Sequence, residues 1–279
     1  MCSYSSRCGS VDIRYPFYLA NATKVITAVN KTYSCGYTDL KISCRDDGET
    51  ETAIIQLGQF TYTVKNISYE ASTMILADPD AFRNDGNYGC PIIRHNVTFS
   101  REWLSYTGSY DTLAFFFGCY SGDSAPPGFN AYQISCPGFS NSSSGGASFV
   151  FSSDQLDATR EHDLDKHCDD IVAVPIRRGS LEGMSNRPAL QSEYGSLLRD
   201  GFELAWSPTT VGGCYRCEES GGRCVYNQNK LFLGCLCSNE KVETQYCSNS
   251  SASSTKSRSR SPIETDCFKR TPSFYIFVS

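Results

Sequence analysis

Fifteen cysteines in 279 residues constrain this chain more than any other feature. Such density is rare in a reducing cytosol and is typical of proteins that fold where disulfides form. Five cysteines crowd into the segment 214–237, and we expect them to pair among themselves and with Cys247. A zinc site is the alternative, but the cluster contains no histidine. We predict disulfides at Cys8, Cys35, Cys44, Cys90, Cys119, Cys136, Cys168, Cys214, Cys217, Cys224, Cys235, Cys237 and Cys247.

Asn-x-Ser/Thr sequons point to the same compartment. An attached glycan must face solvent, so an occupied sequon also marks the protein surface. The six sequon asparagines are Asn21, Asn30, Asn66, Asn96, Asn141 and Asn249. With the cysteines, they predict a glycosylated extracellular protein.

Two features of a secreted or anchored protein are missing. The first residues lack the basic start and apolar core of a signal peptide, and no stretch approaches the roughly 20 apolar residues of a membrane span. We expect an incomplete chain, and the odd cysteine count agrees with this view. The basic segment 257–262, Ser-Arg-Ser-Arg-Ser-Pro, raises the alternative of a phosphorylatable tail of an intracellular protein. Because that alternative leaves the cysteines and sequons unexplained, we favour a disordered tail from an altered transcript.

The length of the chain and the change in its composition from one half to the other predict two modules, since domains average about 150 residues. The fold class that we expect is mainly β with minor α, in two disulfide-rich extracellular modules. The expected divisions are a β module over 1–139, a Ser/Gly linker over 140–153, a second cysteine-rich module over 154–247 and a disordered Ser/Arg tail over 248–279.

Local patterns place elements within these modules. β-branched and aromatic residues predict strands over 13–18, 40–44, 60–69, 113–117, 171–176 and 201–206. The alternation in 60–69 loses its phase at Asn66. Ser152 and Gln155 have the spacing of a helix capping box, and 181–201 is helical in pattern although Pro188 interrupts it.

Motifs across the chain carry a family resemblance. The first half contains Cys8-Gly9-x3-Ile13-x-Tyr15-Pro16-Phe17, Cys35-Gly36-x3-Leu40-x3-Cys44, Tyr62-x-Val64-x2-Ile67 and Phe115-Phe116-Phe117-x-Cys119. It resembles the galacturonan-binding extracellular domain of plant wall-associated receptor kinases. The second half contains Cys168-x3-Val172-x-Val174-Pro175, Gly201-Phe202-x-Leu204-x-Trp206, Cys214-x2-Cys217-x2-Ser220-Gly221-Gly222-x-Cys224 and Phe232-x2-Cys235-x-Cys237. It is similar to the cysteine-rich module that follows in these receptors, most nearly in the leaf-rust-resistance-locus type.

The resemblance implies binding of cell-wall pectic polysaccharide by an extracellular domain that faces the wall, in a receptor system anchored in the plasma membrane by one span. Polygalacturonate is a polyanion, so its receptor needs Arg or Lys for carboxylates and aromatic faces for sugar rings. Segment 1–66 has seven basic residues against six acidic ones, whereas 140–237 has nine against thirteen, so we expect the ligand on the N-terminal module. The candidate ligand-binding residues are Arg14, Lys41, Arg45, Tyr15 and Tyr18. Ordinary solvated charge and core packing of the aromatic residues remain the alternatives.

Other functions have less support. Val225 stands where the family has Gly after the Ser-Gly-Gly-x-Cys motif, and the kinase motifs are absent, so we expect no kinase activity and no other enzyme in this chain. His162 and His167 are five residues apart, which does not match a zinc-binding helical pair. We expect no cofactor, no metal, no nucleic-acid partner at a net charge of −5, and no membrane contact from this chain itself. A domain that binds a peptide or protein without glycan affinity is the alternative function.

Overall fold

The computed structural model shows a mainly β protein with minor α, which confirms the predicted fold class. It describes residues 5–21, 24–26, 31–46, 48, 50–82, 90–108, 110–120, 128–134, 146–161, 163–181, 190–208 and 212–248, with side chains omitted at 24–26, 31, 32, 158, 160 and 161. The described residues up to Cys247 form one compact unit, and the predicted tail lies outside the described residues from 249 onward.

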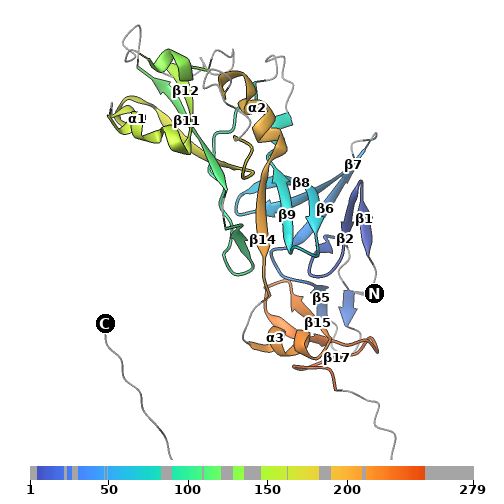
Figure 1. The fold of residues 1–279 in the computed structure, drawn as a ribbon. Helices are drawn as coiled ribbons and strands as arrows, with labels where there is room; N and C mark the ends of the chain where they lie inside the picture. The colour runs from blue at the N-terminus through green and yellow to red at the C-terminus, as the bar shows by residue number, and fades with distance from the viewer. Residues whose placement is uncertain are drawn as a thin grey trace, which may run out of the picture. The chain divides into compact units, whose positions relative to one another are not determined.

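A seven-stranded sheet is the largest element of the first unit (Figure 1). Its order is β10-β14-β9-β8-β7-β6-β3, and only the β3–β6 pair is parallel. The strands are β3 (Tyr18–Leu19), β6 (Lys41–Asp46), β7 (Glu51–Leu57), β8 (Phe60–Ser68), β9 (Thr73–Ala77), β10 (Leu104–Tyr106) and β14 (Phe202–Trp206). The pairing of β8 with β9 shifts its register between Val64 and Asn66, which explains why the alternation loses its phase there.

The two faces of this sheet differ, because successive side chains of a strand point to opposite sides. One face packs into the main core, which includes Ile42, Ile55, Tyr62 and Leu204. On β6 the opposite face carries Lys41, Ser43 and Arg45, all exposed. The hairpin of β1 (Ser6–Cys8) and β2 (Val11–Ile13) adds residues to the core side.

The chain turns after β2 instead of continuing as the predicted strand 13–18. The Phe17 N–H donates to the Arg14 carbonyl at 2.8 Å, and β3 begins only at Tyr18. Proline fixes its own φ and has no N–H to donate, so Pro16 favours a turn over continued strand pairing.

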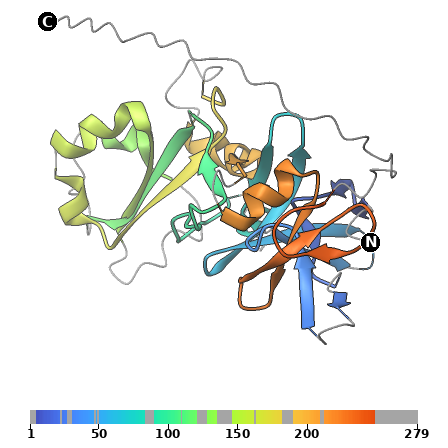
Figure 2. The same ribbon diagram turned by 90° about the horizontal axis from the view of Figure 1, so that it is seen from below.

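A separate three-stranded sheet has the strand order β12-β11-β13. Its strands are β11 (Asp111–Cys119), β12 (Ala147–Ser152) and β13 (Asp170–Ile176). Leu113, Phe115 and Phe117 pack with helix α2 (Leu190–Asp200) in one cluster, whereas Ala114 and Phe116 belong to another cluster. Both faces of β11 are therefore buried. Figures 1 and 2 show the strands of this sheet with helix α2 beside them.

Short helical segments complete this part of the fold. They are η1 (Pro79–Phe82), η2 (Phe129–Tyr132), η4 (Ser153–Gln155), α1 (Leu156–Glu161) and η5 (Leu164–His167). Ser152 and Gln155 form the predicted capping box, but it begins the short η4 segment. Helix α2 starts at Leu190, and residues 182–189 of the predicted helix lie outside the described residues.

A five-stranded sheet brings the two halves of the sequence together. Its order is β17-β16-β15-β5-β4, with β4 (Lys24–Ile26), β5 (Lys31–Cys35), β15 (Arg223–Asn227), β16 (Phe232–Leu236) and β17 (Val242–Glu243). Strand β15 pairs with β5 in the register Val225–Cys35, and helix α3 (Gly212–Glu219) packs beside β15 and β16. Strand β14 likewise lies between β10 and β9. Segments of both predicted modules thus share sheets, and residues 147–152 of the predicted linker form β12 because their apolar side chains are buried.

Disulfides fasten these elements. The bridges are Cys8–Cys44, Cys119–Cys168, Cys214–Cys224, Cys217–Cys235 and Cys237–Cys247. Cys35 and Cys90 are also disulfide-bonded, and Cys136 lies outside the described residues. The prediction that the C-terminal cluster pairs internally and with Cys247 is confirmed.

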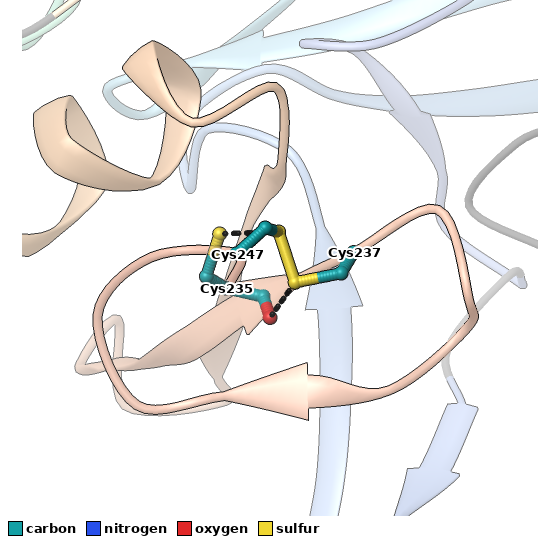
Figure 3. Close-up of side chains that lie close together, drawn as sticks. All are labelled: Cys235, Cys237 and Cys247. Carbon is teal, nitrogen blue, oxygen red and sulfur yellow. Dashed lines mark hydrogen bonds between the residues drawn. A yellow bond between two sulfur atoms is a disulfide. The ribbon is translucent and has the colours of Figure 1, made fainter. Parts of the chain in front are cut away.

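Cys235 lies beside the Cys237–Cys247 bridge (Figure 3). The Cys235 and Cys247 sulfur atoms are 3.5 Å apart although they belong to different disulfides. Gly222 fits against them: an added Cβ would lie 2.2 Å from the Cys235 sulfur and 2.7 Å from the Cys247 sulfur. The Ser-Gly-Gly motif thus needs glycine at this position for steric reasons.

Candidate functional site

Two hollows share three lining residues, Thr38, Lys41 and Lys230. The first has a volume of about 370 Å³ and is also lined by Tyr18, Ala20, Tyr33, Ser34, Asn227 and Gln228. The second has a volume of about 360 Å³ and is also lined by Asp39, Gln56, Leu57, Gly58, Ser100 and Leu104. We call the pair the shared groove, because β15 and the turn after it supply one side and β3 and β6 the other.

Strand register positions Lys41. Ile42 points into the core, so Lys41 before it must point to the opposite, exposed face of β6. Lys41 lies beside Tyr18 of β3 in the sheet. Within the described part of the chain, Lys41 has no carboxylate partner, which leaves its ammonium group available to a ligand.

A tight turn positions Lys230. Asn227 begins this turn: its side-chain oxygen accepts the N–H groups of Asn229 and Leu231, each at 2.9 Å. Lys230 has a φ of 61°, in the left-handed region, and its N–H donates to the Asn227 carbonyl at 3.0 Å. The ammonium group of Lys230 pairs with the Asp39 carboxylate. Its side chain is nevertheless 62% exposed, so it can contact a second anion.

The groove is cationic and rich in neutral polar groups. Its charged lining residues are Lys41, Lys230 and Asp39, and the last two already pair. Burial raises the pKa of the Tyr18 hydroxyl, so this group stays a neutral hydrogen-bond donor. One net positive charge surrounded by hydroxyl and amide groups suits a hydroxylated anion.

Of the five predicted ligand residues, Tyr18 and Lys41 line the groove. Arg45 lies four residues further along β6, on the same exposed face as Lys41. In the register of β6 with β7, this face also carries Thr52, and neither strand places a carboxylate on it among the described residues. The structure therefore brings three of the five predicted residues to one side of the sheet.

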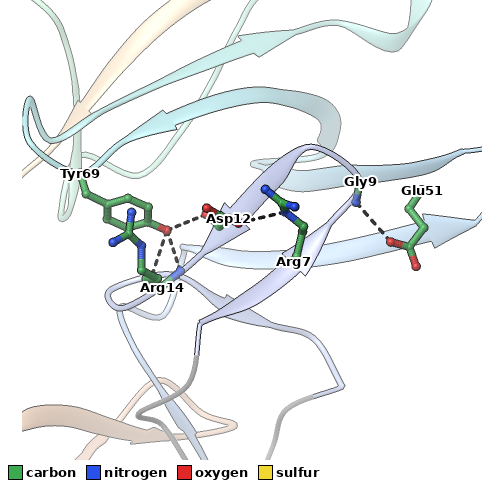
Figure 4. Close-up of polar contacts among 6 residues, drawn as sticks. All are labelled: Arg7, Gly9, Asp12, Arg14, Glu51 and Tyr69. Carbon is green, nitrogen blue, oxygen red and sulfur yellow. Dashed lines mark hydrogen bonds and ion pairs between the residues drawn. The ribbon is translucent and has the colours of Figure 1, made fainter.

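Arg14 belongs to another part of the surface, around Tyr69 (Figure 4). The Arg14 guanidinium lies 4.3 Å from the centre of the Tyr69 ring, and the backbone N–H of Arg14 donates to the Tyr69 hydroxyl at 2.6 Å. The same hydroxyl donates to the Asp12 carbonyl at 3.0 Å, while Arg7 pairs with the Asp12 carboxylate at 3.1 Å. These contacts hold the end of β2 against the β8–β9 turn.

Tyr15 makes contacts inside the protein, which agrees with the alternative that the aromatic residues pack in the core. Its hydroxyl donates to the Glu218 carboxylate, which also accepts the Tyr37 hydroxyl at 2.8 Å. The Tyr15 and Tyr37 rings meet edge to face with centres 5.8 Å apart. Burial, and then the hydrogen bond to Glu218, raises the pKa of Tyr15. Tyr15 lines neither hollow, and it joins the first module to helix α3.

Among the groove residues that sequence reasoning missed, Asn227, Gln228 and Lys230 are those from the second half of the chain. They lie almost 200 positions from Lys41 and reach it only because β15 pairs with β5. The acidic excess in 140–237 argued against a ligand contact there, since a charge count does not show which side chain faces which surface. The Asn227 turn was the one local signal available.

Another polar cluster joins Asp78, Asp80 and His95, whose ligating atoms lie within 4.8 Å of one another. The His95 and Asp78 side chains already pair at 2.9 Å, and the His95 ring stacks on Phe60 with centres 3.6 Å apart. Burial raises the pKa of the Asp78 carboxyl. The ion pair holds the segment around His95 against the end of β9, and the ring stack holds it against β8. His167 instead stacks on Tyr120, and His162 lies outside the described residues.

Comparison with known proteins agrees with this architecture. The family model for the wall-associated receptor kinase galacturonan-binding domain matches residues 2–78, and that for the wall-associated receptor kinase C-terminal domain matches residues 135–240. The shared groove takes Tyr18, Lys41 and their neighbours from the first match and Asn227 to Lys230 from the second. No solved structure matches the chain.

Two curated proteins of Arabidopsis thaliana are similar over most of the chain. One, leaf rust 10 disease-resistance locus receptor-like protein kinase-like 1.2, is 26% identical over 85% of this chain and 32% of its own length. The other, the kinase-like 2.8 protein of the same name, is 27% identical over 88% of this chain and 25% of its own length. The chain thus spans about a quarter to a third of these relatives.

No helix among the described residues is long and apolar enough to cross a membrane. The two family models match the chain in the order predicted from its motifs, and together they cover more than half of it. The chain belongs to the extracellular regions of the wall-associated type of receptor-like kinase, with a galacturonan-binding module followed by the C-terminal cysteine-rich module.

Proposed function

We propose that this chain binds de-esterified pectic polysaccharide in the shared groove, as the wall-facing, non-catalytic part of a receptor-like kinase. The observation that carries the proposal is the meeting of Lys41 and Lys230 in a groove built by both family modules. Galacturonan carries one carboxylate on each sugar and hydroxyl groups between the carboxylates. The lysines can pair with the carboxylates. The tyrosine, serine, threonine, asparagine and glutamine side chains can form hydrogen bonds with the hydroxyl groups.

The overall charge makes a local cationic site necessary. A chain with a net charge of −5 repels a polyanion at long range. At physiological salt, charges more than about 8 Å apart are largely screened, so contacts within the groove decide the affinity. A hydrogen bond to a charged group contributes about 1.5–3 kcal/mol, and a few such contacts support micromolar to millimolar binding. Arg45 extends the cationic surface along β6.

An extracellular, glycosylated state is part of the same proposal. The described sequon asparagines Asn21, Asn66 and Asn96 are all exposed, as glycan attachment requires. Asn96 accepts the Ala173 N–H at 2.8 Å through its side-chain oxygen, which leaves the amide nitrogen for a glycan. Asn30, Asn141 and Asn249 lie outside the described residues. A glycosidase-sensitive mass increase in the secreted protein is the expected result.

The binding test uses the full chain secreted behind a supplied signal peptide. We expect de-esterified oligogalacturonate to bind, the fully methyl-esterified form to bind at least tenfold more weakly, and affinity to fall steeply with salt. Lys41→Gln should weaken binding about tenfold, the equivalent of 1.4 kcal/mol. The control, Lys166→Gln, changes a lysine that is 66% exposed and lies outside the groove.

Other outcomes separate the alternatives. Equal affinity for the esterified polymer, or an unchanged Lys41→Gln variant, contradicts the electrostatic mechanism. Absence of binding to any pectic oligomer favours the alternative in which the domain binds a peptide or protein partner. Shortened oligomers after prolonged incubation would instead indicate an enzyme.

A further inference from the structure

Three aromatic rings form a stack next to the shared groove. The Tyr106 and Tyr110 rings are nearly parallel, at 28°, with centres 4.2 Å apart. Phe99 meets Tyr106 edge to face at 5.1 Å. Phe99 and Tyr106 pack against the main core, whereas Tyr110 is 44% exposed. The core thus fixes the inner two rings, and the outermost ring meets solvent.

The stack is continuous with the groove along the chain. Ser100 and Leu104 line the second hollow, and Phe99 directly precedes Ser100. Leu104 and Tyr106 are two residues apart on β10, so they lie on the same side of the strand, about 7 Å apart. Leu104 belongs to the main core and Tyr106 packs against the same core, so the second hollow and the aromatic rings share one stretch of β10.

A cation accompanies the rings. Arg101 follows Ser100 and is exposed. Arg101 lies in the turn 101–103 directly before β10, the strand that carries Tyr106. Burial raises the pKa of Tyr106, and the positive charge of Arg101 opposes that rise. Arginine binds carboxylates with two parallel hydrogen bonds, a geometry that lysine lacks.

Exposure of Tyr110 is the unusual feature. A tyrosine that contributes to folding stability through burial lies inside, as Tyr62 and Tyr194 do in this fold. Stacking on Tyr106 holds the Tyr110 ring in one orientation, so a binding partner would lose little conformational entropy in meeting it. A flat apolar face beside a guanidinium matches the C–H face and the carboxylate of one uronic acid ring.

We propose that Tyr106, Tyr110 and Arg101 form a second subsite, which binds a uronic acid residue of the same polymer that fills the shared groove. This inference rests on the proposed function and deepens it. Its consequence is a dependence on ligand length. Short oligogalacturonates occupy the groove alone, and longer ones gain affinity when they reach the aromatic stack.

The test is a length series of oligogalacturonates, from the disaccharide upward, measured by calorimetry on the full chain. Tyr110→Ala should lower affinity about fivefold for long oligomers and leave short ones unchanged, since an aromatic contact contributes about 0.5–1.5 kcal/mol. Tyr110→Phe should bind like wild type, because it keeps the ring. The control is Tyr246→Ala, which removes a ring that is 58% exposed elsewhere on the surface.

The Arg101→Gln variant tests whether this subsite recognises the free carboxylate of the ligand. It should remove the preference for a free acid over a methyl ester at the far end of a long oligomer, with the preference at the groove intact. Unchanged or length-independent effects of Tyr110→Ala, with Lys41→Gln still impaired, overturn the second subsite and leave the proposed function standing. Failure of the wild-type chain to bind any oligomer overturns both. Thermal unfolding of each variant checks that the fold is intact.

Discussion

Replacing Glu218 by alanine should destabilise the fold far more than an ordinary surface change. Glu218 lies in the last turn of α3, where the helix dipole disfavours a carboxylate by about 0.3–1 kcal/mol. Two phenols offset this cost: the Tyr15 hydroxyl donates to it, and the Tyr37 hydroxyl donates at 2.8 Å. Tyr37 is only 2% exposed, so water cannot readily replace the carboxylate.

The expected loss follows from what remains after truncation. A buried donor left without an acceptor costs about 1–3 kcal/mol. Tyr15 is only partly buried and recovers some hydration, so we expect Glu218→Ala to lower the free energy of unfolding by about 2–4 kcal/mol. Glu218→Gln keeps an acceptor oxygen and should cost about 1 kcal/mol.

Urea unfolding with the disulfides intact measures this loss, because Trp103 and Trp206 are buried and report unfolding by fluorescence. The matched control is Glu219→Ala, since the neighbouring Glu219 accepts the Tyr215 hydroxyl at 2.6 Å on the exposed side of the same helix. We expect the control to cost less than about 0.5 kcal/mol. Equal losses for Glu218→Ala and Glu219→Ala would refute the reasoning that buried phenols depend on Glu218.

Three further changes test packing, charge and protonation. Gly222→Ala should cost about 1–3 kcal/mol by urea unfolding because its Cβ would meet three sulfur atoms, whereas Gly108→Ala, in open space, should be neutral. Asp39→Asn should raise affinity for de-esterified oligogalacturonate several-fold in calorimetry, because it frees Lys230 from its ion pair. Burial raises the pKa of Tyr62 above the ordinary 10.0, so the unfolding free energy should stay constant with respect to this group below pH 10 and fall above it. Phenolate absorbance that appears before unfolding in the wild type and is missing from Tyr62→Phe would contradict this last expectation.

Local patterns predicted the parts of the fold that depend on neighbours in sequence. The alternation in 60–69 corresponds to β8, the loss of phase at Asn66 to its bulge, and the segment 201–206 to β14. The cysteine cluster predicted that its members pair among themselves and with a nearby cysteine, because few partners lie within reach, but it did not predict which cysteine pairs with which. In each case the determining contacts are local or nearly so.

The same reasoning could not predict which strands pair when they lie far apart in the sequence. Nothing in 223–227 indicates that it pairs with β5, and that register alone brings Lys230 to Lys41. The predictions for Arg14 and Tyr15 had the same weakness. Both residues lie within a matched motif, yet one packs over Tyr69 and the other bonds to Glu218. A motif marks residues that the fold needs, and these need not be residues that a ligand touches.

The most direct test of a groove shared by both modules is the affinity of Lys230→Gln for de-esterified oligogalacturonate. Lys230 belongs to the C-terminal match, and its loss also leaves the Asp39 carboxylate without its ion-pair partner in the groove. We predict a loss of at least tenfold, as large as for Lys41→Gln, with an unchanged unfolding midpoint. Wild-type affinity in Lys230→Gln, together with weakened binding in Lys41→Gln, would contradict the account and confine the ligand to the N-terminal module.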